Sequence, residues 1–471
     1  MIDRDLGLPP LLGESLTVPV TAGRGGAVDA ALTELDGRRV AWFRLAGGKH
    51  VGAISTVEGG ILERLVGHAL ELGVPVIGEI ASSGADVGEG LPALHAWGRV
   101  AAAVSRASGT VPVILSVFGP CVSGPALLLG LADHVVMTSD AFAYVCGPHA
   151  VTEFTGIPTT RAELGGAIVH QTRTGVASLL VDDEDDARWA MLDLLSFLPA
   201  NYLEVPPVTP CADPHDRPCR AAASAVPSRA TASYDIRVVI NDVCDRESFL
   251  EVRGASAPNV VTGYGRLAGS PVGIIANQPL QKAGTLDIEA SSKAARFVQC
   301  CDAFGLPLVT FVDSPGFQPG RDLEWQGMIR HGAELVHAYS AASVPRVCVV
   351  VRKAYGGAFI VMDSRGLGND LCVSWPTAQI AVMGAPGAVN VLYRKQLAAI
   401  ADPDERAARQ AELEAEYVER HCTPAMAAER GYVDDVIDPL DTRRVLIAGL
   451  ASLRSKRAST GSPAKHTNTP L

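Results

Sequence analysis

Two glycine-rich turns, one in each half of the chain, are the features of this sequence best suited to do chemistry. They lie at residues 119–124 (GPCVSG) and 353–358 (KAYGGA), each directly after a short apolar run. Glycine lets backbone approach a ligand closely, and the first N–H groups of a helix lack partners and point the same way. Such turns can stabilise an oxyanion with backbone donors alone. Tight strand–helix packing explains either turn equally well, but two at matched positions favour an enzyme with paired sites.

Other catalytic motifs are missing from the sequence. It contains no GxSxG elbow, no P-loop, no HExxH motif and no GxGxxG motif after a strand. No CxxC pair or Cys/His cluster has the spacing of metal ligands, so we expect no metal site. The acidic run 182–186 is typical of a solvated helix start. His95, His134 and His331 share no motif and are expected to be structural or surface residues.

An internal repeat organises the chain. The runs GVPVI (73–77) and GLPLV (305–309) have the same spacing as Gly84 and Gly316 (316 − 84 = 232), and Gly147 and Gly384 follow at a similar offset (384 − 147 = 237). A nearly constant offset indicates a duplicated domain. In each half, β-branched runs alternate with helical stretches, which predicts βα units with buried, mostly parallel strands.

The domain boundaries follow from composition. Residues 205–231 are rich in Pro, Ala, Ser and Asp and show little periodicity, so we expect a linker there. The predicted lobes are therefore residues 1–204 and 232–471, and the polar tail from residue 455 is expected to be an extended arm.

Bulk composition narrows the class of protein. A net charge of −11 over 471 residues disfavours nucleic acid as a partner. The sequence has no apolar run of about twenty residues, so we expect no membrane-spanning helix. Residues 1–5 (MIDRD) are not typical of the start of a secretory signal. The ten cysteines stand mostly in apolar contexts, which indicates reduced thiols in a cytoplasmic protein.

In combination, motifs from about Ala41 onward resemble the carboxyltransferase (beta) subunits of biotin-dependent acyl-CoA carboxylases, the propionyl-CoA and acetyl-CoA carboxylase beta family. The resemblance implies an α/β fold of two tandem crotonase-like (ClpP/crotonase superfamily) ββα-superhelix domains. The motifs are 274–279 (IIANQP), 294–298 (AARFV), 310–317 (TFVDSPGF), 352–358 (RKAYGGA), 374–385 (SWPTAQIAVMGA), 427–434 (AAERGYVD) and 465–468 (KHTN).

The resemblance also implies a reaction and its partners. A biotin carboxylase and biotin carboxyl carrier (alpha) subunit makes carboxybiotin. Biotin then releases carbon dioxide, its ureido anion removes the α-proton of an acyl-CoA, and the enolate attacks the carbon dioxide. Two anions then need two oxyanion holes and no protein base. The chain has no Ala-Met-Lys-Met site for covalent biotin. Family members form a hexamer whose active site lies between the N-lobe of one subunit and the C-lobe of its neighbour.

Residue roles are carried over from the same resemblance. The N–H groups of Ser123 and Gly124 are expected to bind the acyl thioester oxygen, and those of Gly357 and Ala358 the ureido oxygen of biotin. The further residues expected to contact substrate are Gly84, Ala85, Gly147 and Ile360, and those expected to contact biotin are Gly316, Phe317, Gly356, Gly384 and Ala385.

Departures from the family pattern gather in the first half. Asp86 replaces an arginine, and the first turn reads Val-Ser-Gly-Pro, with Ser123 and Pro125 in place of glycine and alanine. In the second half, Ile360 stands where propionyl-specific relatives often carry aspartate. This pattern predicts that biotin is retained while the acceptor is an unusual acyl-CoA or a carrier-bound acyl group.

Two alternatives remain open from the sequence. The same enolate chemistry run in reverse describes a malonyl- or methylmalonyl-thioester decarboxylase. The altered first half is also compatible with a degenerate subunit that only holds a carboxylase assembly together.

Overall fold

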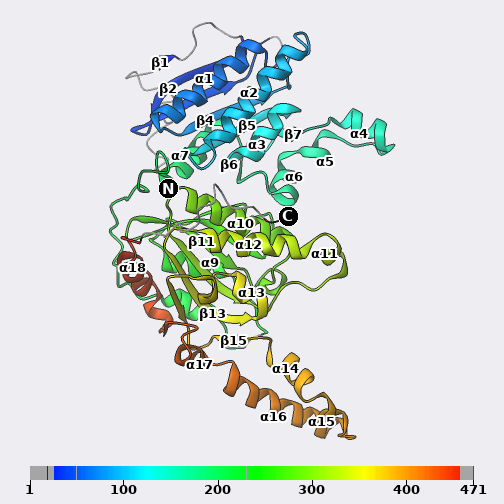
Figure 1. Ribbon diagram of the computed structural model, residues 1–471, viewed down its shortest axis with the longest axis vertical. Coiled ribbons are helices and arrows are strands. Elements are labelled where there is room, and N and C mark those ends of the chain that lie inside the picture. The colour runs from blue at the N-terminus through cyan, green and yellow to red at the C-terminus, as the bar shows by residue number, and fades with distance from the viewer. Residues whose placement is uncertain (1–17, 20–25, 49, 230, 457–469, 471) are drawn as a thin grey trace, which may run out of the picture. The chain divides into compact units, whose positions relative to one another are not determined.

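The computed structural model describes residues 18–19, 26–48, 50–229, 231–456 and 470, and the chain divides into two compact units (Figure 1). The first unit holds the residues up to Pro207 together with Val252–Ser256 and Ala303–Gly305. The second holds Val208–Glu251, Ala257–Asp302 and the chain from Leu306 onward. The expectations for residues 1–5 and for the motif at 465–468 fall outside the described residues.

A mostly parallel sheet forms the centre of the first unit. Its strand order is β1-β2-β3-β4-β5-β6-β8, with β7 paired to β5. Strands β1 to β3 are antiparallel neighbours, and the pairs from β3–β4 onward are parallel. The strands are β1 (Val18–Pro19), β2 (Val28–Leu35), β3 (Arg38–Leu45), β4 (Val76–Ser82), β5 (Val113–Val122), β6 (His134–Thr138), β7 (Phe142–Tyr144) and β8 (Leu179–Val181). The helices are α1 (Thr56–Leu72), α2 (Leu91–Ala107), α3 (Gly124–Leu131), α4 (Pro148–Thr155), α5 (Arg161–Gly165), α6 (Ala167–Val169) and α7 (Glu184–Phe197).

Helix α1 shows how the local sequence determines where a helix of the first unit begins and ends. Ser55 and Glu58 form a reciprocal capping box at its start, and Gly73 ends it with a φ of 63°. Ile61 and Leu65 face the core and are buried. Burial of such a side chain contributes about 1.5–3 kcal/mol, so the apolar stripe and the caps together hold the helix on the sheet.

The second unit repeats this plan. Its strand order is β16-β14-β13-β12-β11-β10-β9, with β15 paired to β13, and β10–β11 is antiparallel whereas the pairs from β11–β12 to β14–β16 are parallel. The strands are β9 (Leu250–Val252), β10 (Val260–Leu267), β11 (Ser270–Asn277), β12 (Leu308–Ser314), β13 (Arg346–Tyr355), β14 (Leu371–Ser374), β15 (Gln379–Ala381) and β16 (Asp435–Val436). The helices are α8 (Arg220–Ala225), α9 (Ile236–Val243), α10 (Ile288–Ala303), α11 (Arg321–Trp325), α12 (Met328–Ala341), α13 (Gly356–Val361), α14 (Ala385–Leu392), α15 (Arg394–Ala398), α16 (Pro403–His421), α17 (Pro424–Glu429) and α18 (Thr442–Ser452).

The duplication predicted from residue spacing also appears in the local geometry at the ends of β4 and β12. The register shifts between Ile80 and Ser82 on β4 and between Val312 and Ser314 on β12. A Cβ added to Gly52 would stand 2.0 Å from the Ala81 carbonyl oxygen, and one added to Gly284 would stand 2.5 Å from that of Asp313. Both glycines have positive φ, so each half needs glycine at the same place to pack a loop onto the bulge that ends its strand.

The segment that was predicted to be a linker belongs largely to the second unit. Residues 208–231 belong to the second unit, α8 forms within them, and Cys219 and Ala222 are completely buried in that unit's core. Composition indicated a linker, but the small apolar residues of this segment pack against α9.

The acidic run, two of the histidines and the cysteines take structural positions in the fold. Asp183 caps α7, so the acidic run is a helix start as predicted. His134 is buried beside Ser178, and His331 lies 3.0 Å from Glu334. All ten cysteines are free thiols. Within the described residues no group of side chains could hold a metal ion, and no helix is long and apolar enough to cross a membrane.

Candidate active site

The first turn joins β5 to α3 through Ser123. This residue has a φ of 61°, and its N–H donates to the Tyr144 carbonyl oxygen at 2.9 Å because β5 pairs with β7 there. The Ser123 N–H is therefore not an available donor, which corrects the predicted Ser123–Gly124 pair. Gly124 is the first residue of α3, and its N–H has no acceptor among the described residues.

A neighbouring loop brings a second donor to this turn. Ile54 donates to the Gly84 carbonyl oxygen at 2.8 Å and accepts from the Asp86 N–H at 2.9 Å, so Ala85 lies at the centre of a parallel bridge. The N–H of such a central residue points away from the bridge, and that of Ala85 has no acceptor in the described chain. A Cβ on Gly84 would stand 3.5 Å from the Ser123 Cβ, so the loop lies beside the turn.

The second turn joins β13 to α13 in the same way. Gly356 has a φ of 60°, and a Cβ there would stand 3.0 Å from the Val382 carbonyl oxygen, so this position requires glycine. Gly357 and Ala358 follow in the first turn of α13, where N–H groups have no intrahelical acceptor. Both predicted residues therefore lie where their N–H groups are free of intrahelical bonds.

The loop beside the second turn also repeats the first. Leu286 donates to the Gly316 carbonyl oxygen at 3.2 Å and accepts from the Gln318 N–H at 2.8 Å, which leaves the Phe317 N–H without an acceptor in the described chain. The Phe317 ring lies 3.4 Å from the point where a Cβ on Gly357 would stand. The structure thus brings Gly316 and Phe317 to the second turn, as it brings Gly84 and Ala85 to the first.

The remaining predicted residues flank these turns. Gly147 and Gly384 cap α4 and α14, and Cβ atoms there would meet the rings of Tyr144 at 3.5 Å and Tyr355 at 3.2 Å. Ala385 begins α14 and is buried.

A cleft of about 800 Å³ opens beside the second turn, within the second unit. Ile360, which follows the turn on α13, lines it and is 43% exposed. The wall that α16, α17 and their flanks contribute was not predicted from the sequence, where the family motif at 427–434 was the one signal for it. The other lining residues are Gly356, Gly357, Phe359, Ser364, Arg365, Gly366, Ile380, Ala381, Val382, Leu392, Tyr417, His421, Met426, Ala427, Arg430 and Tyr432.

A buried charged group supports the second turn from behind. Asp313 accepts from Arg352 Nε at 2.9 Å and from the Lys353 N–H at 3.1 Å, and the Lys353 ammonium lies 3.8 Å from it. These contacts tie the end of β12 to the end of β13. Burial lowers the pKa of Lys353, although Asp313 opposes that effect. Two cations face one carboxylate, so this turn has an excess of positive charge suited to an anion.

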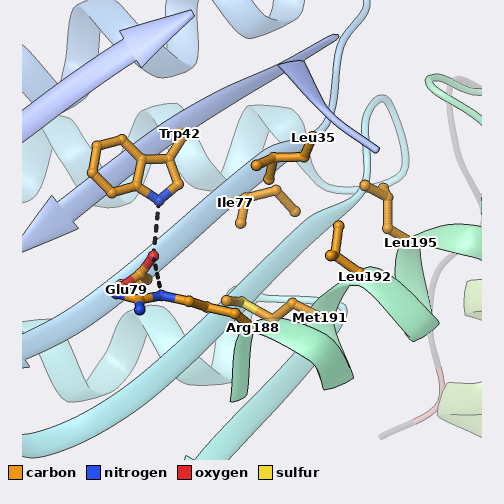
Figure 2. Close-up of a pocket in the computed structure, with 8 residues that line it drawn as sticks. All are labelled: Leu35, Trp42, Ile77, Glu79, Arg188, Met191, Leu192 and Leu195. Carbon is orange, nitrogen blue, oxygen red and sulfur yellow. Dashed lines mark hydrogen bonds and ion pairs between the residues drawn. The ribbon is translucent and has the colours of Figure 1, made fainter. Parts of the chain in front are cut away.

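The first unit has a smaller cavity that serves packing. Trp42 and Arg188 both point to Glu79, as Figure 2 shows, and Trp42 Nε1 donates to Glu79 Oε1 at 3.0 Å. Burial alone would raise the pKa of Glu79, but the hydrogen bonds from Arg188 and Trp42 outweigh it and lower that pKa. Leu35 and Leu192 close the cavity. A carboxylate already satisfied by three donors, Arg44 included, is part of the scaffold.

Comparison with known proteins agrees with this geometry. The model of the carboxyl transferase domain family matches residues 21–469. The carboxyltransferase subunit of propionyl-CoA carboxylase from Haloferax mediterranei is 46% identical over 449 residues, which is 95% of this chain and 86% of that protein. The methylmalonyl-CoA decarboxylase subunit alpha of Veillonella parvula is 39% identical over 448 residues, 95% and 86% of the two chains.

A solved structure extends the likeness to three dimensions. The transcarboxylase 12S hexamer with methylmalonyl-coenzyme A and methylmalonic acid bound superposes with a TM-score of 0.92 at 38% identity, over 98% of this chain and 91% of that one. The fold and its paired turns define an enzyme of two tandem crotonase-like lobes, as predicted. The chain belongs to the carboxyl transferase domain family, and it is a carboxyltransferase.

Proposed function

We propose that this chain transfers a carboxyl group from carboxybiotin, carried by a partner alpha subunit, to the α-carbon of an acyl-CoA or related acyl thioester. The observation that carries the proposal is the pair of turns, each with N–H donors that no residue of the described chain uses. A reaction that passes through an enolate and a ureido anion needs two such sites and no side-chain base.

The first lobe, residues 1–204, is assigned to the acyl thioester. There the N–H groups of Ala85 and Gly124 replace the pair expected from the sequence, because the Ser123 N–H is already bonded to Tyr144. They would hold the thioester oxygen as the enolate forms. A donor of this kind contributes about 10²–10³ in rate.

The second lobe, residues 232–471, is assigned to biotin. Gly357 and Ala358 present N–H groups, Gly356 leaves the approach open, and Lys353 adds positive charge, so the residues fit a ureido oxygen that becomes negative. When bound, carboxybiotin supplies the carbon dioxide and the base. This chain holds and orients that group and excludes water.

The acceptor is proposed to carry a larger apolar acyl group than propionyl. In the proposed hexamer the second lobe of one subunit would face the thioester bound to the first lobe of its neighbour, so the cleft beside the second turn would receive the body of the acyl group. Ile360, Val382 and Leu392 give this cleft an apolar wall, and Arg365 and Arg430 also line it. An acyl chain with an apolar body gains about 0.8 kcal/mol for each methylene it buries there.

The relatives support a proposed assembly, and the cysteines support a proposed location. The transcarboxylase 12S subunit was solved as a hexamer with substrate, and we propose a homohexamer with a biotin carboxylase and carrier subunit for this chain. Burial raises the pKa of the Cys121 and Cys244 thiols to about 12, so they stay protonated and inert. Unpaired, unreactive thiols suit the cytoplasm, where we place the protein.

The test is carboxylation of a panel of acyl thioesters by the purified oligomer, a biotinylated alpha subunit and ¹⁴C-bicarbonate with ATP. Label fixed in an acid-stable product supports the transferase, and a preference for acyl groups larger than propionyl supports the acceptor. No label with any acceptor, although the alpha subunit carboxylates its own biotin, would contradict the proposal.

The second candidate is a decarboxylase of malonyl or methylmalonyl thioesters. It is favoured by the 39% identity to the methylmalonyl-CoA decarboxylase subunit alpha of Veillonella parvula. The two turns could serve both directions of the reaction. Transfer of the carboxyl group from methylmalonyl-CoA to free biotin, without net carboxylation of any acyl thioester, would favour the decarboxylase.

A further inference from the structure

One indole in the first unit carries a donor that has no partner in the described part of the chain. Trp97 lies on α2, and its Nε1 is buried without a hydrogen bond. It lies 2.6 Å from the point where a Cβ on Gly124 would stand, so the indole edge rests against the backbone of the first turn. Unpaired buried donors are rare in native proteins, and each one asks for a physical reason.

Trp42, on β3 of the same unit, shows the ordinary arrangement. Trp42 Nε1 donates to Glu79 Oε1 at 3.0 Å (Figure 2). The same lobe therefore pairs the Trp42 indole N–H with a carboxylate and leaves the Trp97 N–H against Gly124. The difference marks Trp97 as the exception, and it lies at the proposed thioester site.

The first turn also lacks a donor that the second turn has. Ser123 and Gly356 each directly follow their strand, β5 or β13, and have nearly the same positive φ, so Gly124 corresponds to Gly357 and Pro125 to Ala358. Proline has no N–H, so the first turn is left with Gly124 and the neighbouring Ala85 where the second has Gly357, Ala358 and the neighbouring Phe317. The shortage and the spare indole donor occur at the same turn.

We propose that the Trp97 indole N–H donates to the thioester oxygen of the substrate and replaces the backbone donor missing at Pro125. This inference rests on the proposed function of the first lobe. In the free chain Nε1 is covered, so the indole must turn slightly to meet the oxygen. The ring is only partly buried, and Gly124 offers no side chain to obstruct it. A donor that is dry until the substrate arrives is strong when it bonds.

Trp97→Phe tests the proposal, because it removes the N–H and keeps a flat ring. We expect kcat/KM for acyl-thioester carboxylation to fall about 10²-fold, while the melting temperature holds or rises because an unpaired donor is lost. Trp42→Phe is the matched control: it leaves Glu79 short of a donor, so it should lower the melting temperature and leave kcat/KM within about threefold of wild type.

Pro125→Ala provides the decisive rescue. It restores the backbone N–H that proline lacks, so Trp97→Phe/Pro125→Ala should regain activity to within about fivefold of wild type. The carbonyl stretch of a ¹³C-labelled acyl thioester, followed by infrared spectroscopy on the bound complex, should move toward its free value in Trp97→Phe and back in the double variant. This reading needs no turnover.

Two results would overturn the proposal. One is a Trp97→Phe enzyme with unchanged kcat/KM and an unchanged carbonyl stretch. The other is a loss that Pro125→Ala does not restore. In either case an active wild-type enzyme leaves the carboxyltransferase function standing, whereas a wild-type oligomer that neither binds nor carboxylates any acyl thioester would overturn both.

Discussion

Ser123 and Gly356 have nearly the same positive φ, 61° and 60°, at the entrance to α3 and α13. One is a serine and the other a glycine, although both turns do the same geometric work. A non-glycine residue in this region carries strain of about 1–2 kcal/mol per residue. The first turn thus bears a cost that the second avoids.

Substitutions at these two positions should distinguish the effect of backbone strain at Ser123 from the effect of steric crowding at Gly356. Ser123→Gly is expected to raise the free energy of unfolding by up to about 1 kcal/mol, because it relieves the positive φ. Gly356→Ala is expected to lower activity at least about 10²-fold, because its Cβ would stand 3.0 Å from the Val382 carbonyl oxygen and displace the donors. Urea unfolding and steady-state kinetics on both variants measure the two effects. An unaffected Gly356→Ala enzyme would show that the second turn is not the site.

Asp313 should prove to be a structural support of the second turn. Asp313→Ala leaves the buried Arg352 and Lys353 without their carboxylate, and removal of one partner of a buried pair costs about 3–5 kcal/mol. Glu412→Ala is the control, because it breaks a solvent-exposed pair with Arg409 that contributes little to stability. Chemical unfolding of both variants checks the prediction; equal losses would mean that the Asp313 group adds no support.

The repeat and the turns could be read from the sequence, because glycines required by backbone geometry recur at a fixed offset. The hydrogen bond of the Ser123 N–H could not be predicted from the sequence. It depends on β7, a strand of three residues that pairs with β5 only in the folded sheet. The wall of the cleft was missed for a similar reason: Tyr417 on α16 reaches it only through folding. The unpaired donor of Trp97 could not be predicted, because no local sequence pattern indicates which indole N–H has a hydrogen-bond acceptor in the fold.

The stability of the second unit should depend on pH through Asp363, which lies just after α13. Burial raises its pKa to about 7, although the Arg346 guanidinium at 2.7 Å opposes the shift. The unfolded chain releases this proton near the ordinary aspartate pKa of 3.8 and the folded chain only near 7. Stability from this group is therefore full below about pH 4 and is lost as the pH rises to about 7.

Asp363→Asn tests that sign. Whatever constant offset the amide introduces, the free energy of unfolding of the variant should rise relative to wild type between about pH 4 and pH 7, because the variant has no proton to lose there. Asp404→Asn on the exposed start of α16 should leave the slope unchanged. Parallel curves for Asp363→Asn and wild type would show that Asp363 is ionised in the fold throughout this range.

Ile360 should set which acyl groups the enzyme accepts, because its half-exposed side chain lines the cleft directly after the second turn. Ile360→Asp places a carboxylate against the apolar wall and removes the contact that a large acyl chain would make. Loss of that burial, at about 0.8 kcal/mol for each methylene, together with an unpaired charge, should lower kcat/KM for acyl groups of six or more carbons by at least about tenfold. The value for propionyl-CoA should change less, so the ratio of the two is the quantity to measure. Val391→Asp is the control, since Val391 is 69% exposed on α14 and is not part of the cleft lining. If Ile360→Asp lowers both substrates equally, the residue supports the turn and does not select the acceptor.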